Sequence, residues 1–416
     1  MHIERHFNFA TLADQFPAWN ALAQGVPFRQ WEWVEAWWRH YGCDANGSPK
    51  PDYELLVLAV HDDAGHLIGV APWYRHKTRT GARVIRFLGD GEVCSDHLTL
   101  LCDGENQHAI AEELADWLTA GNQTASTSGQ AHHRYKSVPE TNDHPSDNHW
   151  DRLEIAGVAA DDEPINLLLK ALAARDNRLH HSPALNTWNV ALPATWEEFL
   201  MLLSKPHRNR LRRADKNFLR TGRVTVHYVH TPAELPKFFD TLVALHQGRW
   251  QRRGMPGCFA SEAFCKFHRE ISERFIADGR ATLSWLELDG TPLAAEYRLH
   301  GEGTMYAYQC GIDPDRLKVQ PGELANMTAI RNAIEHGQQQ YDFLRGDEPY
   351  KAHWRAQPRP QLAVRVVPKR ASARLRHTAW LAGQSMKEWV KSGLELTHLR
   401  HRNEPYKPVA ATADEH

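Results

Sequence analysis

The sequence predicts an α/β fold of the mixed-sheet (α+β) kind, built as a tandem duplication of one unit. Two hairpins carry this prediction, because residues 54–74 and residues 281–299 each show an apolar strand, a turn containing Asp and Gly, and a second apolar strand. After each hairpin come a third strand, a loop, a helix and a short closing strand, in the same order. Two similar α/β units in tandem are the economical explanation of this order.

The elements that follow the hairpins pair off between the two halves. We expect third strands at 83–88 and 304–310, helices at 107–119 and 322–336, and closing strands at 152–155 and 341–344. The helix at 322–336 is supported by Leu324, Met327, Ile330 and Ile334, which recur at helical spacing. Amphipathic helices at 31–41 and 232–253 precede the hairpins, and the tryptophans of the first are expected in the core.

Composition excludes several classes of protein. The 416 residues are 42% hydrophobic and 24% charged, as in globular proteins, and the net charge of −2 disfavours a nucleic-acid packager or a general membrane binder. No stretch approaches the length of a spanning helix and the N-terminus lacks a secretory pattern, so we expect a cytoplasmic protein without a transmembrane segment. Six cysteines without a C-x-x-C pair, and 26 histidines without ligand spacing, predict no metal site.

The chain divides into two units and a tail. We expect an N-terminal unit over 1–192, a C-terminal unit with the active site over 193–368, and a basic helical tail over 369–416. Within the first unit, residues 121–150 are almost free of apolar residues and predict a disordered insertion. A metal-binding interpretation of its histidines fits no metal-site spacing: His132, His133, His144 and His149. The tail either packs on its own protein or lies on a membrane surface as a basic amphipathic helix.

The segment after the last strand of the second unit holds the densest group of chemistry-bearing residues. Asp342 lies in that strand, and Arg345, Gly346 and Asp347 follow it, with Lys351 a few residues on. Loops that leave strand ends are where rigid scaffolds present catalytic groups. The alternative is an ion-pair network that only closes the sheet.

A second candidate is the loop before the helix at 322–336. Lys318 and Gly322 lead into a helix start, whose free amides can bind an anion such as a pyrophosphate. Ordinary helix capping explains the same pattern. The basic run 205–220 could likewise grip a phosphorylated substrate or RNA, or form a solvated helix face.

Three further residues lie on predicted strands. Glu296 is surrounded by apolar residues, so burial would raise its pKa and suit it to general-base catalysis. Tyr306 and Tyr308 share one face of the next strand, where a hydroxyl could donate a proton. Packing is the simpler role for strand aromatics.

Several segments resemble the CelD/BcsL-type family of GNAT-like acetyltransferases, which is related to the FemAB transferases. They are WEWVEAWWRHYG, GHLIGVAPWY, RFLGDGEVCSDHLTL, RNRLRRADKN, HQGRWQRRGMPGCF, PLAAEYRL, YQCGIDPD and, above all, QPGELANMTAIRNAIEHGQQQYDFLRGDEPYKAHW. The resemblance implies tandem GNAT-like acyltransferase folds and acyl transfer from a thioester, usually acetyl-CoA, to an amine or hydroxyl. Family members are often associated with exopolysaccharide or cellulose biosynthesis.

The resemblance also implies roles for individual residues. CoA would be received by the strand at 304–310 and by the loop residues Lys318, Gln320 and Gly322. Glu296 or Asp342 would act as the base, Tyr308 or Tyr306 as the acid, and Arg345 with Lys351 as acceptor clamps. The loop departs from the usual GNAT pattern Gln/Arg-x-x-Gly-x-Gly/Ala and keeps only Gln-Pro-Gly, so its role rests on the family.

Three functional hypotheses follow. The first is an acyl-CoA-dependent transferase that acts on a sugar or polysaccharide precursor, without a metal and without DNA as a partner. The second is a FemAB-like transferase that takes its acyl group from aminoacyl-tRNA, for which the basic run would be the contact surface. The third is a non-catalytic scaffold of a polysaccharide synthesis complex that retains the fold alone.

Overall fold

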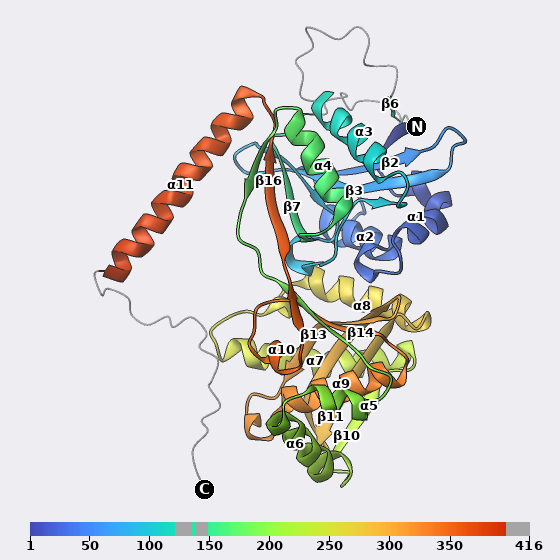
Figure 1. Ribbon diagram of the computed structural model, residues 1–416, viewed down its shortest axis with the longest axis vertical. Helices are drawn as coiled ribbons and strands as arrows, with labels where there is room; N and C mark the ends of the chain where they lie inside the picture. The colour runs from blue at the N-terminus through green and yellow to red at the C-terminus, as the bar shows by residue number, and fades with distance from the viewer. Residues whose placement is uncertain (121–134, 138–148, 397–416) are drawn as a thin grey trace.

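The computed structural model describes residues 1–120, 135–137 and 149–396 and shows two mixed sheets, each covered by helices (Figure 1). The predicted α/β fold of tandem units with mixed sheets is therefore confirmed. Figure 1 shows the units stacked along the long axis, with the strands of the first above those of the second.

The first sheet has nine strands in the order β6-β1-β2-β3-β4-β7-β16-β8, with β5 paired to β3. The strands are β1 (His2–His6), β2 (Tyr53–His61), β3 (Leu67–Lys77), β4 (Arg83–Phe87), β5 (Leu101–Cys102), β6 (Tyr135–Ser137), β7 (Arg152–Ala159), β8 (Arg178–His181) and β16 (Gln361–Val367). The β2–β3 hairpin lies where the sequence predicts it. Most pairs are antiparallel, but β4 and β7 are parallel.

The second sheet has seven strands in the order β10-β11-β12-β13-β14-β9-β15. The strands are β9 (Thr187–Ala191), β10 (Val224–Tyr228), β11 (Ala281–Leu288), β12 (Thr291–Gly301), β13 (Thr304–Ile312), β14 (Gln340–Arg345) and β15 (Gln357–Arg359). The hairpin β11–β12 is antiparallel, as is β12–β13, whereas β13 and β14 are parallel.

Two strands cross between the units. β9 comes before the expected boundary at residue 192, yet it pairs with β14 in the second sheet. β16 lies within the segment expected to belong to the second unit, yet it inserts between β7 and β8 of the first sheet. In each case the backbone N–H and C=O groups of the strand pair with a strand that is distant in the sequence. Local sequence cannot assign the strand to a sheet, because this pairing depends on the tertiary structure.

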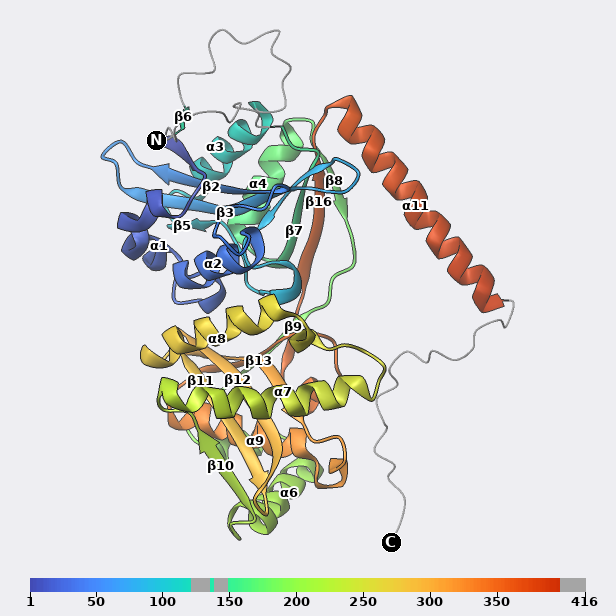
Figure 2. The same ribbon diagram turned by 180° about the vertical axis from the view of Figure 1, so that it is seen from behind.

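Eleven α-helices lie in the described part of the chain. They are α1 (Phe16–Leu22), α2 (Trp31–Trp37), α3 (Gln107–Ala120), α4 (Glu163–Ala174), α5 (Trp196–Leu202), α6 (Lys205–Ala214), α7 (Leu235–Gln251), α8 (Glu262–Ala277), α9 (Pro321–Glu335), α10 (Tyr350–His353) and α11 (Ala371–Leu396). From behind, α7 and α8 run across the second unit, with α8 between that unit and the first (Figure 2).

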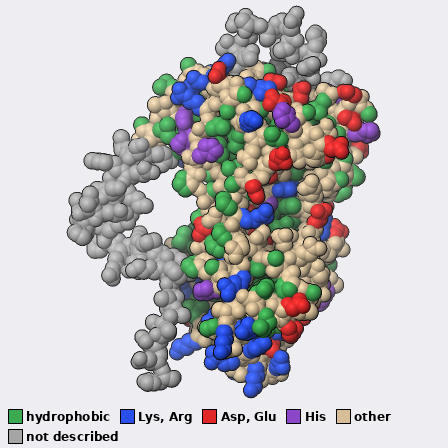
Figure 3. Space-filling model, viewed as in Figure 1, with side chains coloured by type: hydrophobic (Ala, Val, Ile, Leu, Met, Phe, Trp, Pro, Cys, Tyr) green, Lys and Arg blue, Asp and Glu red, His purple; other side chains and the backbone are tan. Residues whose placement is uncertain are grey.

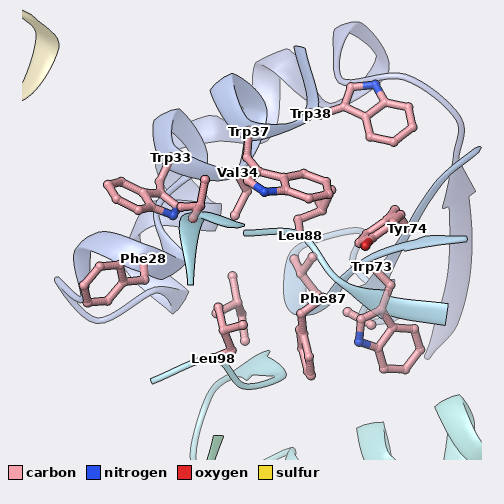
Figure 4. Packing of buried hydrophobic residues seen from close by; sticks show 14 of the residues in the cluster. Phe28, Trp33, Val34, Trp37, Trp38, Trp73, Tyr74, Phe87, Leu88 and Leu98 are labelled. Atoms are coloured by element: carbon pink, nitrogen blue, oxygen red, sulfur yellow. The ribbon is translucent and has the colours of Figure 1, made fainter. Parts of the chain in front are cut away.

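The aromatic residues of α2 form the centre of the first core, as predicted. Trp33 and Trp37 are buried and lie over the sheet, close to Phe87 and Leu88 (Figure 4). Trp33 also makes an edge contact with Phe267 of α8, with ring centroids 4.9 Å apart. One continuous core therefore joins the two units and fixes α8 against both.

The insertion and the tail are only partly described. Residues 121–134 and 138–148 of the expected insertion lie outside the described residues, but Trp150, which was included in it, is fully buried and donates to the Leu118 carbonyl at 2.9 Å. The insertion prediction is wrong at this end. In the tail, His377 is buried and Arg365 lies 3.6 Å from the Trp380 ring, so α11 begins against its own protein before it projects away from the body (Figure 1). No helix in the described ranges is long and apolar enough to cross a bilayer.

Candidate active site

The strands β13 and β14 separate within the second sheet. They pair in parallel only from Thr304–Gln340 to Tyr306–Asp342. Beyond that point β13 stays with β12, while β14 turns toward β9. A cavity of about 380 Å³ opens between them, walled by β12, β13, β14, α6, α7, the start of α9 and the loop and helix that follow β14.

The separation leaves one backbone edge of β13 without a strand partner among the described residues. It begins at Ala307, one of the residues that line the cavity. The register skips at this point, because Tyr297 pairs with Gln309 and Arg298 with Ala307, which leaves Tyr308 as an extra residue. A bulge of this kind re-aims backbone groups and is common beside active sites. Free amides here can receive an extended ligand or a developing oxyanion.

Glu296 is the acidic group that suits proton transfer best. Its side chain comes from β12, lines the cavity, and is 6% exposed. Within the ranges that the structure describes, Oε2 has no hydrogen-bond partner, and Nη1 of Arg298 lies 3.6 Å from it. Burial raises the pKa of this carboxyl, and Arg298 opposes the shift only in part. A buried carboxylate with a free oxygen and a raised pKa fits a general base.

The start of α9 forms the mouth of the cavity. Gln320 caps the helix in a left-handed conformation with φ of 54°, and Pro321 takes the first helical position. Gly322 follows and lines the cavity, and an amide at this position has no acceptor within the helix. The predicted cofactor residue Gly322 thus lies at the cavity.

A second hollow of about 240 Å³ adjoins the mouth. It is lined by the predicted Lys318 and Gln320, by the basic residue Arg213, and by Arg210 and Glu323, which also line the main cavity. Arg210 binds Glu323 through Nε, with Oε1 at 2.7 Å and Oε2 at 2.8 Å. The hollow therefore offers cations and a helix N-terminus to an anion.

Lys351 lines the cavity but uses its ammonium group within the protein. Nζ donates to the carbonyls of Leu344, Arg345 and Gly346 at 3.0, 3.1 and 2.9 Å, and lies 3.0 Å from Oε2 of Glu348. The side chain is buried. Its geometry favours a tie that closes the loop after β14 over a clamp on an acceptor.

Arg345 is held by the first unit. Nε donates to Oδ1 of Asp96 at 2.6 Å, the backbone N–H of Arg345 donates to Oδ2 at 3.0 Å, and Nη2 donates to the Ser95 carbonyl at 2.8 Å. Burial raises the pKa of Asp96, and Arg345 opposes this shift. Arg345 borders the cavity, but most of its donors serve the contact between the units.

Asp342 does not line the cavity. Its carboxylate accepts from the Leu344 amide at 2.7 Å and lies 3.0 Å from Nε2 of His97 in the first unit. The Tyr306 ring lies 5.6 Å from the His97 ring on the same side, and burial raises the pKa of Tyr306 to about 12. Of the two predicted bases, the geometry favours Glu296 over Asp342.

Tyr308 lines the cavity, but its hydroxyl contacts other parts of the protein. The hydroxyl donates to the Val93 carbonyl at 2.6 Å and lies 3.0 Å from Nε2 of His268. Burial raises the pKa of this phenol. As a proton donor to a leaving group, Tyr308 would have to break the contact with Val93.

Sequence reasoning singled out neither Arg249 of α7 nor His207 of α6, which line the cavity from elements far apart in the chain. Tyr350 of α10, which lies in the predicted segment after the last strand, lines it as well. Arg249 is half-buried and makes no ion pair with any described residue. Nothing in the local pattern of α7 marks Arg249, since only the packing of α7 on β13 brings it to the site.

Comparisons with known proteins agree with this placement. A family model described as "Acetyltransferase (GNAT) domain" matches residues 205–352, which contain all the cavity-lining residues except His353 and Trp354. A search of curated proteins returned no match.

Solved structures share the fold at low identity. A crystal structure of FemX is 13% identical, covers 84% of this chain and 95% of its own, and has a TM-score of 0.56. A conserved protein of unknown function from Bacteroides thetaiotaomicron is 10% identical, with 87% and 99% covered and a TM-score of 0.50. Residues 205–352 thus match a GNAT acetyltransferase domain, within a two-unit fold similar to that of FemX.

Proposed function

We propose that the protein is an acyl-CoA-dependent acyltransferase, with acetyl-CoA as donor and an amine or hydroxyl of a sugar or polysaccharide precursor as acceptor. One observation carries the proposal: β13 and β14 separate around a cavity that has Glu296 in its wall and the start of α9 at its mouth. The match to a GNAT domain over the same residues supports a thioester donor.

The donor would lie along the free edge of β13. Its pyrophosphate would bind at the Gly322 amide, and its remaining phosphate would reach the cations of the adjoining hollow, Arg213 and Lys318. The acyl end would then enter the cavity between the strands. There the donor would take the place of a strand partner and accept hydrogen bonds from the unpaired amides of β13. The departure from the usual glycine-rich loop is compensated here by side-chain cations.

The acceptor would react beside Glu296. Its nitrogen or oxygen attacks the thioester carbonyl carbon while the carboxylate takes up the proton, and amides of the β13 edge stabilise the oxyanion. The carbon–sulfur bond then breaks, and CoA leaves as a thiolate that takes up one proton. Tyr350 lines the cavity and is 43% exposed, so its hydroxyl is a candidate donor beside the predicted Tyr308.

Calorimetric titration with acetyl-CoA tests the donor. Micromolar affinity, about −8 kcal/mol, is expected for the full-length protein, with desulfo-CoA and dephospho-CoA as comparators for the thiol end and the added phosphate. Absence of binding at millimolar acetyl-CoA would contradict the proposal. A binding-positive protein should then be assayed against amino sugars, nucleotide sugars and oligosaccharides, with release of free thiol as the readout.

The alternative donor is an aminoacyl-tRNA, and one observation favours it. Figure 3 shows Lys and Arg gathered at the lower end of the molecule, over α6. Lys205, Arg212, Arg213 and Lys216 are exposed there. Salt-sensitive tRNA binding that disappears when Arg208, Arg210, Arg212 and Arg213 are neutralised, together with no acetyl-CoA binding, would move the assignment to aminoacyl transfer. If the protein binds neither donor, the scaffold hypothesis gains support.

A further inference from the structure

The start of the chain brings three potential metal ligands together, far from the acyl-transfer cavity. His2, Glu4 and His6 alternate along β1 and so share one face of the strand. The antiparallel register places His61 of β2 directly opposite His2. All the described residues that line the acyl-transfer cavity come from 207–354, so this cluster belongs to a different site.

The spacing within the cluster suits one ion. One ligand atom from each of His2, Glu4 and His61 lies within 4.8 Å of the others. Nε2 of His2 is 3.4 Å from Oε1 of Glu4, close to the separation of two ligands that each lie about 2 Å from a tetrahedral metal. The rings of His2 and His61 stack with centroids 5.2 Å apart.

The hydrogen bonds of His61 leave a ligand nitrogen free. Its Nε2 lies 3.2 Å from Oε1 of Gln15, an amide oxygen that can only accept, so Nε2 carries the proton. Nδ1 therefore bears a lone pair. The residue is 4% exposed, and Nδ1 has no hydrogen-bond partner among the described residues. A buried lone pair without a donor is costly unless a cation or a water occupies the space beside it.

His6 has the same property. The Thr11 hydroxyl donates to the Asn8 carbonyl at 3.0 Å, so it accepts the 2.8 Å hydrogen bond from Nδ1–H of His6. Nε2 is then unprotonated and finds no hydrogen-bond partner in the described part of the chain; it lies 3.9 Å from Oε2 of Glu4, and His6 is 2% exposed. Two acceptors that face one another in a half-buried site repel unless a positive or donor group lies between them. In the proposed ligand His61, the contact with Gln15 holds the second ring nitrogen, as is common for histidines that bind metals.

We propose that His2, Glu4 and His61 bind a divalent transition-metal ion of the zinc type, with Nε2 of His6 as acceptor for a water molecule on that ion. Two imidazoles and one carboxylate are a ligand set that zinc accepts, with the fourth position left to water. The ion would connect β1 to β2 across their first residue pair. It would thereby stabilise the N-terminal unit without taking part in acyl transfer.

The test uses full-length protein stripped with a chelator and titrated with Co²⁺, whose visible absorption reports nitrogen and oxygen ligation, and with Zn²⁺ by calorimetry. His132, His133 and His144 of the expected insertion could bind metal on their own, so all variants are made in a background with these three residues replaced by Ala. One equivalent of metal is expected. At a free concentration about 100 times Kd, the unfolding temperature should rise by about 3 °C.

The variants His61→Ala and Glu4→Gln should weaken binding at least about tenfold and abolish the metal-induced rise in unfolding temperature. Glu4→Gln keeps the shape of a side chain 24% exposed, so it retains the fold if His61→Ala does not. His66→Ala is the matched control, because His66 lies in the same hairpin and is exposed beside Asp62. Equal metal affinity in the two test variants and the control would overturn the proposal, as would loss of all binding in the background protein.

Discussion

The two units each contain a pair of parallel strands that separate, but only one separation leaves a cavity suited to a substrate. In the first unit, β4 and β7 pair at Val84–Arg152 and Ile85–Leu153 and then diverge. In the second, β13 and β14 do the same after Tyr306–Asp342. The first space measures about 200 Å³ and the second about 380 Å³.

Charged groups neutralise one another in the first space. Glu154 of β7 binds Arg86 and Arg152 at 2.7 and 2.6 Å, and Arg365 of β16 at 3.0 Å. Burial favours the neutral form of Glu154, but Arg86 and its neighbours outweigh burial and lower its pKa. Glu154 is thus held as a structural anion that does not readily take up a proton.

The second space also differs from the first at one position of the hairpin. Glu296 is the sixth residue of β12, and the sixth residue of β3 is Pro72. The first unit therefore lacks a carboxylate at the position of the proposed base. This difference teaches that one chain order can serve two purposes: the second unit holds the candidate site, while Val93, Asp96 and His97 of the first unit support its strands.

The largest effect is expected at the proposed base. Glu296→Gln should lower kcat/KM for acyl transfer by about 10²–10⁴-fold, because proton removal from the acceptor is lost. The wild-type rate should rise with pH through the raised pKa of Glu296, and the variant should lose this limb. Steady-state kinetics across pH measure both, with Glu154→Gln as the first-unit control. An unchanged rate in Glu296→Gln would show that Glu296 is not the base, and that this carboxylate does not distinguish the second unit from the first.

The same substitution should stabilise the protein. The pKa of Glu296 is higher in the folded than in the unfolded state, so the folded protein binds the proton more tightly. Its contribution to stability is therefore present at acid pH and is lost as pH rises through the folded-state pKa. Thermal melts at neutral pH should show Glu296→Gln above wild type, and the difference should vanish at acid pH. A lower melting temperature at neutral pH would show that the carboxylate is stabilised by unseen partners.

The next effect concerns the contact between the units. Arg345→Met should cost about 3–5 kcal/mol in the free energy of unfolding, because it leaves Asp96 buried without its cation. The double variant Asp96→Asn/Arg345→Met should recover part of this loss. Arg223→Met removes an ion pair to Asp289 in which both side chains are about half exposed, and should cost far less because solvent screens this pair. Urea unfolding measures both free energies. If Arg345→Met and Arg223→Met lower the free energy of unfolding equally, the pair between the units contributes no more than an exposed pair.

A smaller loss is expected at the loop tie. Lys351→Met removes three hydrogen bonds to consecutive carbonyls and should destabilise the protein by about 2–3 kcal/mol. If Lys351 only closes the loop, KM for the acceptor should change little at a temperature where the variant is folded. A large rise in acceptor KM would instead support the predicted clamp role. Asp342 lies outside the cavity, so kinetics of the variant Asp342→Asn test whether this second predicted residue acts as the base.

The smallest effect is expected at the adjoining hollow. Arg213→Ala and Lys318→Ala should each raise KM for acetyl-CoA by about 2–5-fold, since each removes one solvent-exposed cation near an anion. The effect should shrink at high salt. Arg212→Ala, a neighbouring exposed arginine of α6 that does not line the hollow, is the control. Identical changes in Arg212→Ala would mean that general positive charge, and no defined phosphate position, attracts the donor.

The sequence by itself determined the elements and their repetition. Apolar runs on either side of turns that contain Asp and Gly predicted both hairpins, and the spacing of Leu324, Met327, Ile330 and Ile334 predicted α9, because these signals come from neighbours in the chain. It also pointed to Glu296 and Gly322, since a carboxylate within apolar strand residues and a glycine at a helix start are local anomalies.

Only the tertiary structure decided which groups the charged side chains bind. Lys351 and Arg345 look equally free in the sequence, yet one binds three carbonyls and the other binds Asp96, which is 249 residues away. Arg249 enters the cavity and His61 reaches His2 only through the packing of a helix on a strand and the pairing of two strands. The exchange of β9 and β16 between the sheets has the same origin. Side-chain partners and strand partners depend on distances across the fold, and local sequence carries no record of those distances.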